Sequence, residues 1–427
     1  MGETENKKIR IPRFSAGVFG GDRALWVVIV ALAIVSLLVV YSSTASMAYK
    51  EAGGDTSHYV TRQFAFQVIG FITIFVVHRV NYQTYAKYTR LLFVCALGLM
   101  LLTFFVGVDL NDASRWLRIP GTSYTFQPSD FLRVTVVMML AKALAKRQNT
   151  IANSRLFPMI AIPYSTLSER QRRRNTEIIR DTMLPLLVPV GLACGLIVMS
   201  SLSTAAMVFV TCLVMLYVGR VKVRELGKLV VIVLVAGVLF VALMAVSGSG
   251  RGKTWVNRLK AFAPIEQVDE KSTVDNLQEE QAKIAIASGG IIGKGPGNST
   301  QRANLPHSYS DFAYAFIIEE YGLIGGIVVL ALYLWLFFRT VMISRKCERV
   351  FPRLLVLGLG IMIVMQAFIN MMVSVGLFPV TGQTLPLISM GGSSLVFTSL
   401  ALGMILGVSR QMQENSLQTA KEEVAGQ

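Results

Sequence analysis

Residues 307–314 read His-Ser-Tyr-Ser-Asp-Phe-Ala-Tyr, and residues 317–322 read Ile-Ile-Glu-Glu-Tyr-Gly. A long polar loop ends here and a long apolar segment begins. A carboxylate at Asp311 therefore stands at the edge of the bilayer, where it still meets water-soluble chemistry. The rest of the chain is interpreted as a membrane scaffold that places this junction.

Apolar segments of membrane-spanning length recur along the chain. Hydrophobic residues make up 53% of the 427 residues, and the mean hydropathy is +0.55. A helix of about 20 apolar residues crosses about 30 Å of hydrocarbon, whereas a membrane β-barrel shows short alternating segments. The sequence predicts an all-α, polytopic membrane protein with about ten transmembrane helices and one large extracytoplasmic loop. The spans are expected near 24–43, 63–78, 88–107, 130–145, 183–199, 205–217, 229–246, 312–338, 354–373 and 394–408.

The basic residues predict how the chain crosses the membrane. The net charge of +16 comes from lysines and arginines that cluster in loops beside the spans, which is typical of cytoplasmic loops rather than of nucleic-acid binding. We expect a cytoplasmic N-terminal tail at 1–23, a transmembrane domain at 24–409 and a cytoplasmic C-terminal tail at 410–427. Within the domain, 146–182 is the basic cytoplasmic loop and 247–311 the large extracytoplasmic loop.

The cysteines predict neither a disulfide nor a metal site. Three of the four lie in apolar spans, and Cys347 lies in a basic loop. No loop outside the cell holds a pair, and no metal-ligand spacing occurs.

Three carboxylates mark the mouth of the span at 312–338. Asp311 is one, and Glu319 and Glu320 follow about 12–14 Å further along the helix. Such a group is costly unless it faces a cavity, and partial desolvation makes a carboxylate a better general base. Two structural alternatives stay open: Ser310 or Asp311 caps the helix, and the glutamate pair is solvated at the interface.

Two further sets of charged residues each have a structural and a functional interpretation. Asp130 and Arg133 are three residues apart, so they pair on one helix face, either to neutralise each other or to line a groove for a lipid headgroup. Arg115 lies in an outside loop, where its forked donors suit a lipid phosphate. The alternative is an arginine that snorkels to the headgroups beside an interfacial Trp116.

Two segments are rich in helix breakers. The glycine-rich segment 289–299 lacks the P-loop spacing, and we interpret it as a tight turn that lets the backbone approach a ligand. The segment 376–394 interrupts an apolar region with glycine, proline and serine. Irregular backbone at membrane depth requires burial or a cavity, so we expect a re-entrant loop beside a substrate cavity.

These segments, in this order, resemble the SEDS family of peptidoglycan polymerases, over nearly all of the chain from Trp26 to Arg410. The run Pro379 to Leu395 is the most specific. The opening, Gly21 to Trp26 and Val40 to Lys50, is more similar to the division member than to the elongation member. The remaining likeness lies in Val40-Tyr41-Ser42-Ser43, Asn111 to Trp116 with Gln127-Pro128-Ser129, Gly293 to Ser299, and Ser310-Asp311-Phe312 with Glu319-Glu320-Tyr321-Gly322.

The resemblance implies polymerisation of lipid II, with undecaprenyl pyrophosphate as the leaving group. The essential aspartate of the family falls on Asp311, as general base on the acceptor hydroxyl. Arg115, Lys253 and Arg302 are candidates to stabilise the pyrophosphate, and a divalent cation (Mg or Mn) is a candidate to share this role; no cofactor is required from the sequence. Further candidates for substrate binding are Gln127, Asp130, Arg133, Glu319, Glu320, Ser389 and Ser393.

The sequence departs from the family pattern at a few positions. Tyr309 replaces the usual His, and Asp130 and Arg133 replace a Glu and a Lys with their charges kept. Ser201 replaces a carboxylate, which puts in doubt any ion pair in the cavity that would use it.

The resemblance also implies partners and a place. We expect a protein of the bacterial inner membrane, at the division septum, with a class B penicillin-binding protein and other division proteins as partners. The partner would supply transpeptidation and act on the 247–310 loop. The alternatives are an elongation-type polymerase, a lipid II flippase or transporter, and a non-catalytic division scaffold.

Overall fold

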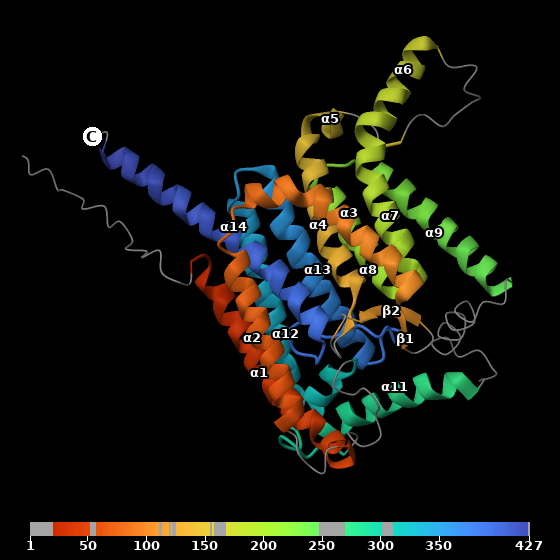
Figure 1. The fold of residues 1–427 in the computed structure, drawn as a ribbon, viewed down its shortest axis with the longest axis vertical. Helices are drawn as coiled ribbons and strands as arrows, with labels where there is room; N and C mark the ends of the chain where they lie inside the picture. The colour runs from red at the N-terminus through yellow and green to blue at the C-terminus, as the bar shows by residue number, and fades with distance from the viewer. Residues whose placement is uncertain are drawn as a thin grey trace, which may run out of the picture.

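The computed structural model describes residues 20–51, 57–110, 113–118, 121, 125–153, 156–157, 168–246, 270–300 and 311–425. Helices dominate these residues and form an elongated bundle (Figure 1). Their all-α arrangement confirms the predicted class. The elements are α1 (Arg23–Glu51), α2 (Ser57–Val77), α3 (Tyr82–Val106), β1 (Val108–Leu110), β2 (Ala113–Arg118), β3 (Thr125–Phe126), α4 (Pro128–Lys146), α5 (Gln148–Asn153), α6 (Glu169–Glu177), η2 (Ile178–Met183), α7 (Leu184–Ser200), α8 (Leu202–Val218), α9 (Val223–Val246), α11 (Glu270–Gly289), α12 (Ala313–Lys346), α13 (Val350–Ser374) and α14 (Gly392–Ala425).

Every predicted span falls on a helix. Among the described residues, 7 helical stretches are long and apolar enough, by length and composition, to cross a membrane. They are Arg23–Ser42, Val60–Val77, Tyr82–Val106, Glu169–Ser200, Ala313–Lys346, Val350–Ser374 and Gly392–Glu423. The shorter α8, together with α4 and α9, occupies the remaining predicted segments. α4 is less apolar because it carries Asp130, Arg133 and Lys142.

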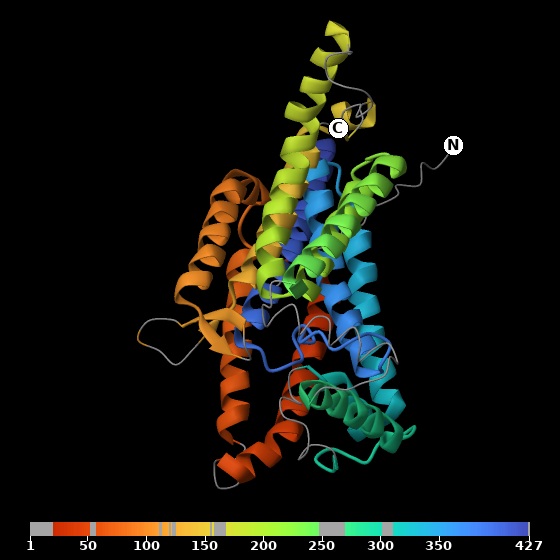
Figure 2. The same ribbon diagram turned by 90° about the vertical axis from the view of Figure 1, so that its right-hand side faces the viewer.

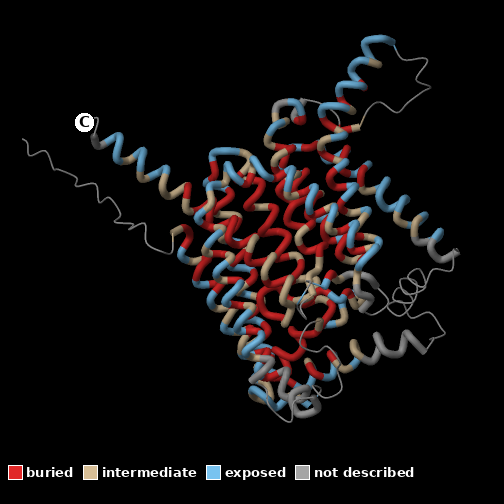
Figure 3. The backbone as a smooth tube through the Cα atoms, in the orientation of Figure 1, coloured by how far each residue is buried: buried red, intermediate tan, exposed pale blue. Residues whose placement is uncertain are grey.

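α13 is the central helix of the bundle. It contacts α4, α8, α12 and α14, and 78% of the residues in its most apolar stretch are buried. Figure 3 shows that buried residues concentrate along the middle of the bundle. Gly360 lets α13 approach α12, because a Cβ there would overlap the side chain of Thr340. Small residues allow such close packing between membrane helices.

The two ends of the bundle differ. α5, α6 and the last turns of α14 lie at one end, which we call the terminal end, and α11 lies at the other, the α11 end (Figures 1 and 2). α6, η2 and α7 form one continuous helical stretch of 32 residues, Glu169–Ser200, which projects beyond the bundle (Figure 2). The predicted loop 146–182 therefore contains helical structure, and α14 continues to Ala425, past the predicted end of the last span.

Two features were not predicted from the sequence. An antiparallel sheet of order β1-β2-β3 joins α3 to α4, in a stretch expected to be a plain polar loop. α11 lies within the expected 247–311 loop. Its sequence is mostly polar, so it gives no signal of a membrane span.

α12 is broken at Gly322, whose φ of 71° and ψ of −175° interrupt the helix. A Cβ at this residue would overlap the carbonyl oxygen of Ile291, so the break depends on glycine. The backbone groups freed by the break bond to the segment that follows α11. Four hydrogen bonds join them: Leu323 N to Gly290 O (3.0 Å), Ile324 N to Ile291 O (3.3 Å), Lys294 N to Glu319 O (3.0 Å) and Gly295 N to Glu320 O (2.9 Å).

Candidate functional site

Asp311 lies directly before α12 and faces the segment between α13 and α14. Asn370 donates from Nδ2 to the backbone oxygens of Asp311 (2.8 Å) and Gln383 (2.7 Å). A Cβ at Gly382 would lie 3.7 Å from Oδ2 of Asp311, so the carboxylate borders this glycine. The N-cap position of α12 falls on Phe312, so Asp311 does not occupy it.

The segment between α13 and α14, residues 375–391, has irregular backbone, and the protein buries its second half, residues 383–389, more fully than its exposed start. Leu385, Ile388 and Ser389 are 1%, 0% and 3% exposed. The hydroxyl of Ser36 in α1 donates to the carbonyl of Ile388 (2.9 Å), and Leu385 N donates to Oγ of Ser389 (2.9 Å). Ser389, a candidate for substrate contact, therefore supports the fold of this segment.

Asp130 and Arg133 form the pair that their spacing predicts. Arg133 Nη2 lies 2.8 Å from Asp130 Oδ1, and both residues are 4% exposed. Arg133 Nη1 also donates to Gln366 of α13 (2.8 Å), which in turn donates to the carbonyl of Thr384 (2.8 Å). The pair is thus one part of a buried polar network that reaches the 375–391 segment. A buried ion pair needs such additional hydrogen bonds to offset its desolvation.

Several buried polar atoms along this network have no hydrogen-bond partner among the described residues. Such atoms are rare in folded proteins, because each one costs desolvation without compensation. Their chemistry covers both donors and acceptors, which suits a polar ligand. They are Asp130 Oδ2, Arg133 Nε, Asn370 Oδ1, Ser374 Oγ and Ser393 Oγ.

The two glutamates of α12 are buried. Glu319 is 0% and Glu320 is 3% exposed, and both accept hydrogen bonds, so the interfacial-solvation alternative is wrong. The glycine-rich segment makes the tight turn that was predicted, with positive φ at four of its glycines. Its backbone packs against α12 at Gly293, and an approach to a ligand stays a prediction.

The other predicted site residues are placed as follows. Gln127 precedes α4 and donates to the hydroxyl of Ser129 (2.9 Å). Arg115 lies in β2, and its side chain is outside the described part, as are Lys253 and Arg302 altogether. Their role toward a pyrophosphate stays a prediction.

Ser201, at the departure from the family pattern, begins α8. Its hydroxyl accepts from Thr204 N (3.4 Å) as an N-cap, and Oγ1 of Thr204 donates to the same hydroxyl (2.9 Å). Gln383 donates to Oγ1 of Thr204 (2.7 Å). Neutral hydrogen bonds therefore join α8 to the 375–391 segment at this point.

Sequence reasoning missed the polar stripe of α13. Gln366, Asn370 and Ser374 follow one another at intervals of four residues within an apolar helix, and all are buried. Residues four apart share a helix face. This spacing was the available signal for the side chains that join the Asp130–Arg133 pair to Asp311.

An apolar cavity of about 330 Å³ lies beside Ser393, the residue before Ser394, whose hydroxyl is 3.1 Å from that of Thr384. It lies between α2, β3 and the start of α14, and Ser393, whose buried hydroxyl lacks a described partner, is in its wall. Its apolar surface suits an alkyl chain. The wall is formed by Arg62, Ala65, Phe66, Ile69, Thr125, Phe126, Gly392, Ser393, Val396 and Phe397.

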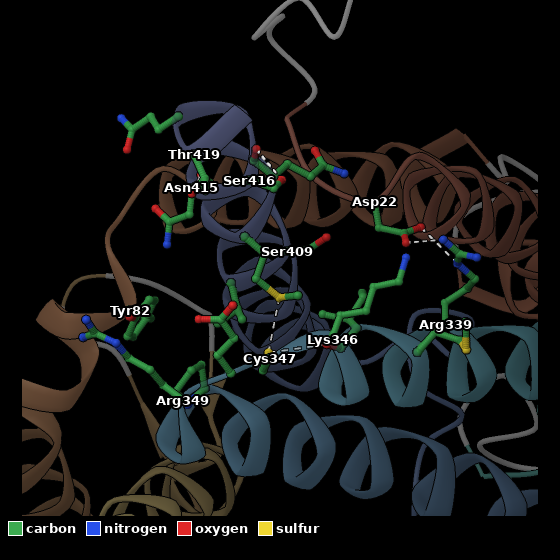
Figure 4. A pocket seen from close by; sticks show the side chains of 18 of the residues that line it. Asp22, Tyr82, Arg339, Lys346, Cys347, Arg349, Ser409, Asn415, Ser416 and Thr419 are labelled. Atoms are coloured by element: carbon green, nitrogen blue, oxygen red, sulfur yellow. Dashed lines mark hydrogen bonds and ion pairs between the residues drawn. The ribbon is translucent and has the colours of Figure 1, made fainter. Parts of the chain in front are cut away.

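A larger cavity, of about 670 Å³, lies at the terminal end, away from Asp311. Figure 4 shows polar side chains of α12 and α14 around it, with Arg339 paired to Asp22 on one side. Its wall includes neither Asp311 nor any member of the buried network. In the described part of the chain, no group of three or more His, Cys, Asp or Glu side chains is arranged to hold a metal ion.

Known proteins are similar to this chain in sequence. The FtsW/RodA/SpoVE family, described as cell cycle proteins, matches residues 22–414. The probable peptidoglycan glycosyltransferase FtsW of Trichlorobacter lovleyi is 30% identical, over 91% of this chain and 93% of that protein. The stage V sporulation protein E of Bacillus subtilis is also 30% identical, over 91% and 97%.

Solved structures have the same fold. A chain from a peptidoglycan synthase complex, studied for the coordination of polymerization and crosslinking, is 24% identical with a TM-score of 0.66, over 92% of this chain and 98% of that one. The rod shape determining protein RodA of Thermus thermophilus is 22% identical with a TM-score of 0.59, over 92% and 97%. Since the match extends over almost the whole helical bundle, the chain belongs to the FtsW/RodA/SpoVE family of cell cycle proteins.

Proposed function

We propose that the chain polymerises lipid II into glycan strands during septal cell-wall synthesis, with Asp311 as the general base. The chain is an enzyme of peptidoglycan synthesis by its family, and relatives that match over nine-tenths of it are named peptidoglycan glycosyltransferases. The observation that carries the assignment of the base is the position of Asp311. It stands at the mouth of α12 and borders Gly382, and Asn370 of α13 binds its carbonyl one helical turn after Gln366, which binds the buried Arg133.

In the proposed reaction, Asp311 accepts the proton of the acceptor sugar hydroxyl. The oxygen then attacks the anomeric carbon of the donor with inversion, and the bond from that carbon to the pyrophosphate breaks. The electron pair leaves with undecaprenyl pyrophosphate. The hydrogen bonds from Asn370 hold the backbone of Asp311, which fixes the base relative to α13.

The apolar cavity and the basic residues support an orientation for lipid II in the site and for the chain in the membrane. The apolar cavity beside Ser393 takes the polyprenyl chain, and the polar atoms of the network face the headgroup. Basic residues of 146–182 gather at the terminal end, which we place in the cytoplasm with both termini. Asp311 then faces the outside, where a class B penicillin-binding protein crosslinks the product.

The test is lipid II polymerisation by the purified chain with its cognate class B penicillin-binding protein. Asp311→Ala and Asp311→Asn are compared with wild type and with Asp181→Asn, an exposed aspartate near the terminal end. We expect both Asp311 variants to lose at least about 100-fold in rate, because general-base catalysis contributes on the order of 10²–10⁴. Full activity of a folded Asp311 variant would remove this residue from the chemistry.

One observation favours a second function, lipid translocation. The Asp130–Arg133 ion pair lies inside the bundle, where transporters place their polar residues. Proteoliposomes with fluorescent lipid II distinguish the two functions. A transporter would expose the inner-leaflet lipid to an external quencher and form no glycan.

A further inference from the structure

Glu319 and Glu320 are adjacent carboxylates inside a segment long and apolar enough to cross a membrane, yet they are only 0% and 3% exposed. Burial of a carboxylate is costly unless hydrogen bonds and opposite charges compensate it. The proposed reaction uses neither residue. Their partners therefore indicate what these carboxylates do.

All the described partners of Glu319 come from one short segment, residues 293–300, which we call the glycine-rich loop. Lys294 Nζ lies 3.0 Å from Oε1, which also accepts from the backbone N (2.9 Å) and the hydroxyl (3.0 Å) of Thr300. The hydroxyl of Ser299 donates to Oε2. One buried carboxylate thus holds both ends of the loop.

Glu320 holds the middle of the same loop through α1. Ser42 of α1 donates its hydroxyl to Oε1 of Glu320 and accepts from the backbone N of Gly297 (2.8 Å). The backbone bonds of Lys294 and Gly295 to the carbonyls of Glu319 and Glu320 complete the contact. The loop is therefore fixed to the first part of α12, on the N-terminal side of Gly322.

This contact determines where the chain enters the candidate active site. Only residues 301–310 separate Thr300 from Asp311. Thr300 is fixed by Glu319, and Asp311 is fixed by Asn370, so both ends of that connection are anchored on helices α12 and α13.

We propose that Glu319 is a positioning residue for the proposed reaction of Asp311, which this inference presupposes. Its carboxylate acts through the glycine-rich loop and does not touch the substrate. Without the four hydrogen bonds, Ser299 and Thr300 lose their contact with α12, and the loop is held only at residues 294–297, further from Asp311. A small displacement of a catalytic group lowers the rate strongly, on the order of 10²-fold per ångström.

The first test compares Glu319→Gln with wild type for two readouts, hydrogen exchange and steady-state kinetics. The amide keeps the size of the side chain but lacks the charge, and its single oxygen cannot replace both Oε1, which accepts from Lys294 and Thr300, and Oε2, which accepts from Ser299. We expect faster exchange of the amides of residues 294–300, and kcat about 10- to 100-fold lower with KM unchanged. A purely structural role would lower the amount of folded protein and leave kcat per folded molecule the same.

The matched control is Glu225→Gln. Glu225 is also a buried glutamate, 4% exposed and 2.8 Å from the ammonium of Lys228. It begins α9, far from the glycine-rich loop in sequence and without a described contact to it. We expect a similar change in stability and full kcat.

A double-variant cycle tests the route of the effect. Lys294→Met leaves the buried charge of Glu319 without its ion-pair partner, and Glu319→Gln removes that charge. If both act through one contact, the double variant loses no more kcat than the worse single variant.

Unchanged exchange of the glycine-rich loop, or unchanged kcat despite faster exchange, would overturn the positioning role. If the proposed function itself is wrong, the results differ. The wild-type protein then forms no glycan, or Asp311→Ala remains active, whatever the result for Glu319→Gln. The positioning role would then have no reaction to act on and would be overturned too.

Discussion

The side chain of Asn370 joins Asp311 to Gln383: one amide nitrogen lies 2.8 Å from the carbonyl oxygen of Asp311 and 2.7 Å from that of Gln383. The central helix of the bundle thereby fixes both the residue before α12 and the buried segment before α14. Neither carbonyl belongs to regular secondary structure, and both accept from this donor.

Asn370→Leu should therefore lower stability and activity together. Two carbonyls lose a hydrogen bond, and the buried carbonyl of Gln383 alone costs about 1–3 kcal/mol if it is left unsatisfied. We expect a lower thermal midpoint in detergent and slower lipid II polymerisation per folded molecule. Asn415→Leu, on the exposed part of α14, is the control. An Asn370→Leu protein with wild-type midpoint and rate would contradict the anchoring of Asp311.

Removal of Arg133 alone should lower the stability of the folded protein more than removal of both members of the ion pair. Arg133→Met leaves Asp130 buried without its counter-charge, which costs about 3–5 kcal/mol. In Asp130→Asn/Arg133→Met no charge is left uncompensated. We expect the double variant to unfold at a higher denaturant concentration than Arg133→Met. Equal midpoints would mean that the two side chains do not depend on each other in the folded protein.

Gly322→Ala should disrupt the break in α12. Alanine disfavours the positive φ of this residue, and its Cβ would overlap Ile291. We expect destabilisation by more than about 1 kcal/mol and loss of glycan synthesis. Gly98→Ala in α3 is the matched control, because nothing lies within 4 Å of its Cβ position. The unfolding midpoint of Gly98→Ala should equal or exceed that of the wild-type protein.

Filling the apolar cavity should weaken binding of the lipid tail. Val396→Trp places a large side chain in the cavity wall beside Phe126 and Phe397. We expect a higher KM for lipid II with little change in kcat, because the tail is remote from the reacting carbon. Val231→Trp, on an exposed face of α9, should leave both constants unchanged. An unaltered KM in Val396→Trp would place the tail elsewhere.

The sequence predicts the helical architecture because membrane spans are marked by composition alone. It also predicts the Asp130–Arg133 pair, since both residues lie on one helix and their spacing suffices. The hydrogen-bond partners of Asp311, Glu319 and Arg133 could not be predicted in this way. Asn370, Thr300 and Gln366 meet them only through the packing of separate segments, which no local pattern encodes.

The break in α12 is a second contact between separate segments that the local sequence does not reveal. The repeated glycines of 289–297 signal tight backbone but not its partner. The structure supplies that partner in α12, where Gly322 and the glycine-rich loop each lack the Cβ that would separate them. A glycine-rich segment alone does not distinguish a ligand from another piece of the same chain.

The break at Gly322 also has a consequence for biosynthesis. Residues 290–295 leave the ribosome before residues 319–324, so the acceptors and donors that the break requires are already made when α12 emerges. Residues 290–295 are thus available to bond the broken helix as soon as it is made. In a chain permuted so that α12 is synthesised first, the backbone groups beside Gly322 would emerge before these partners exist.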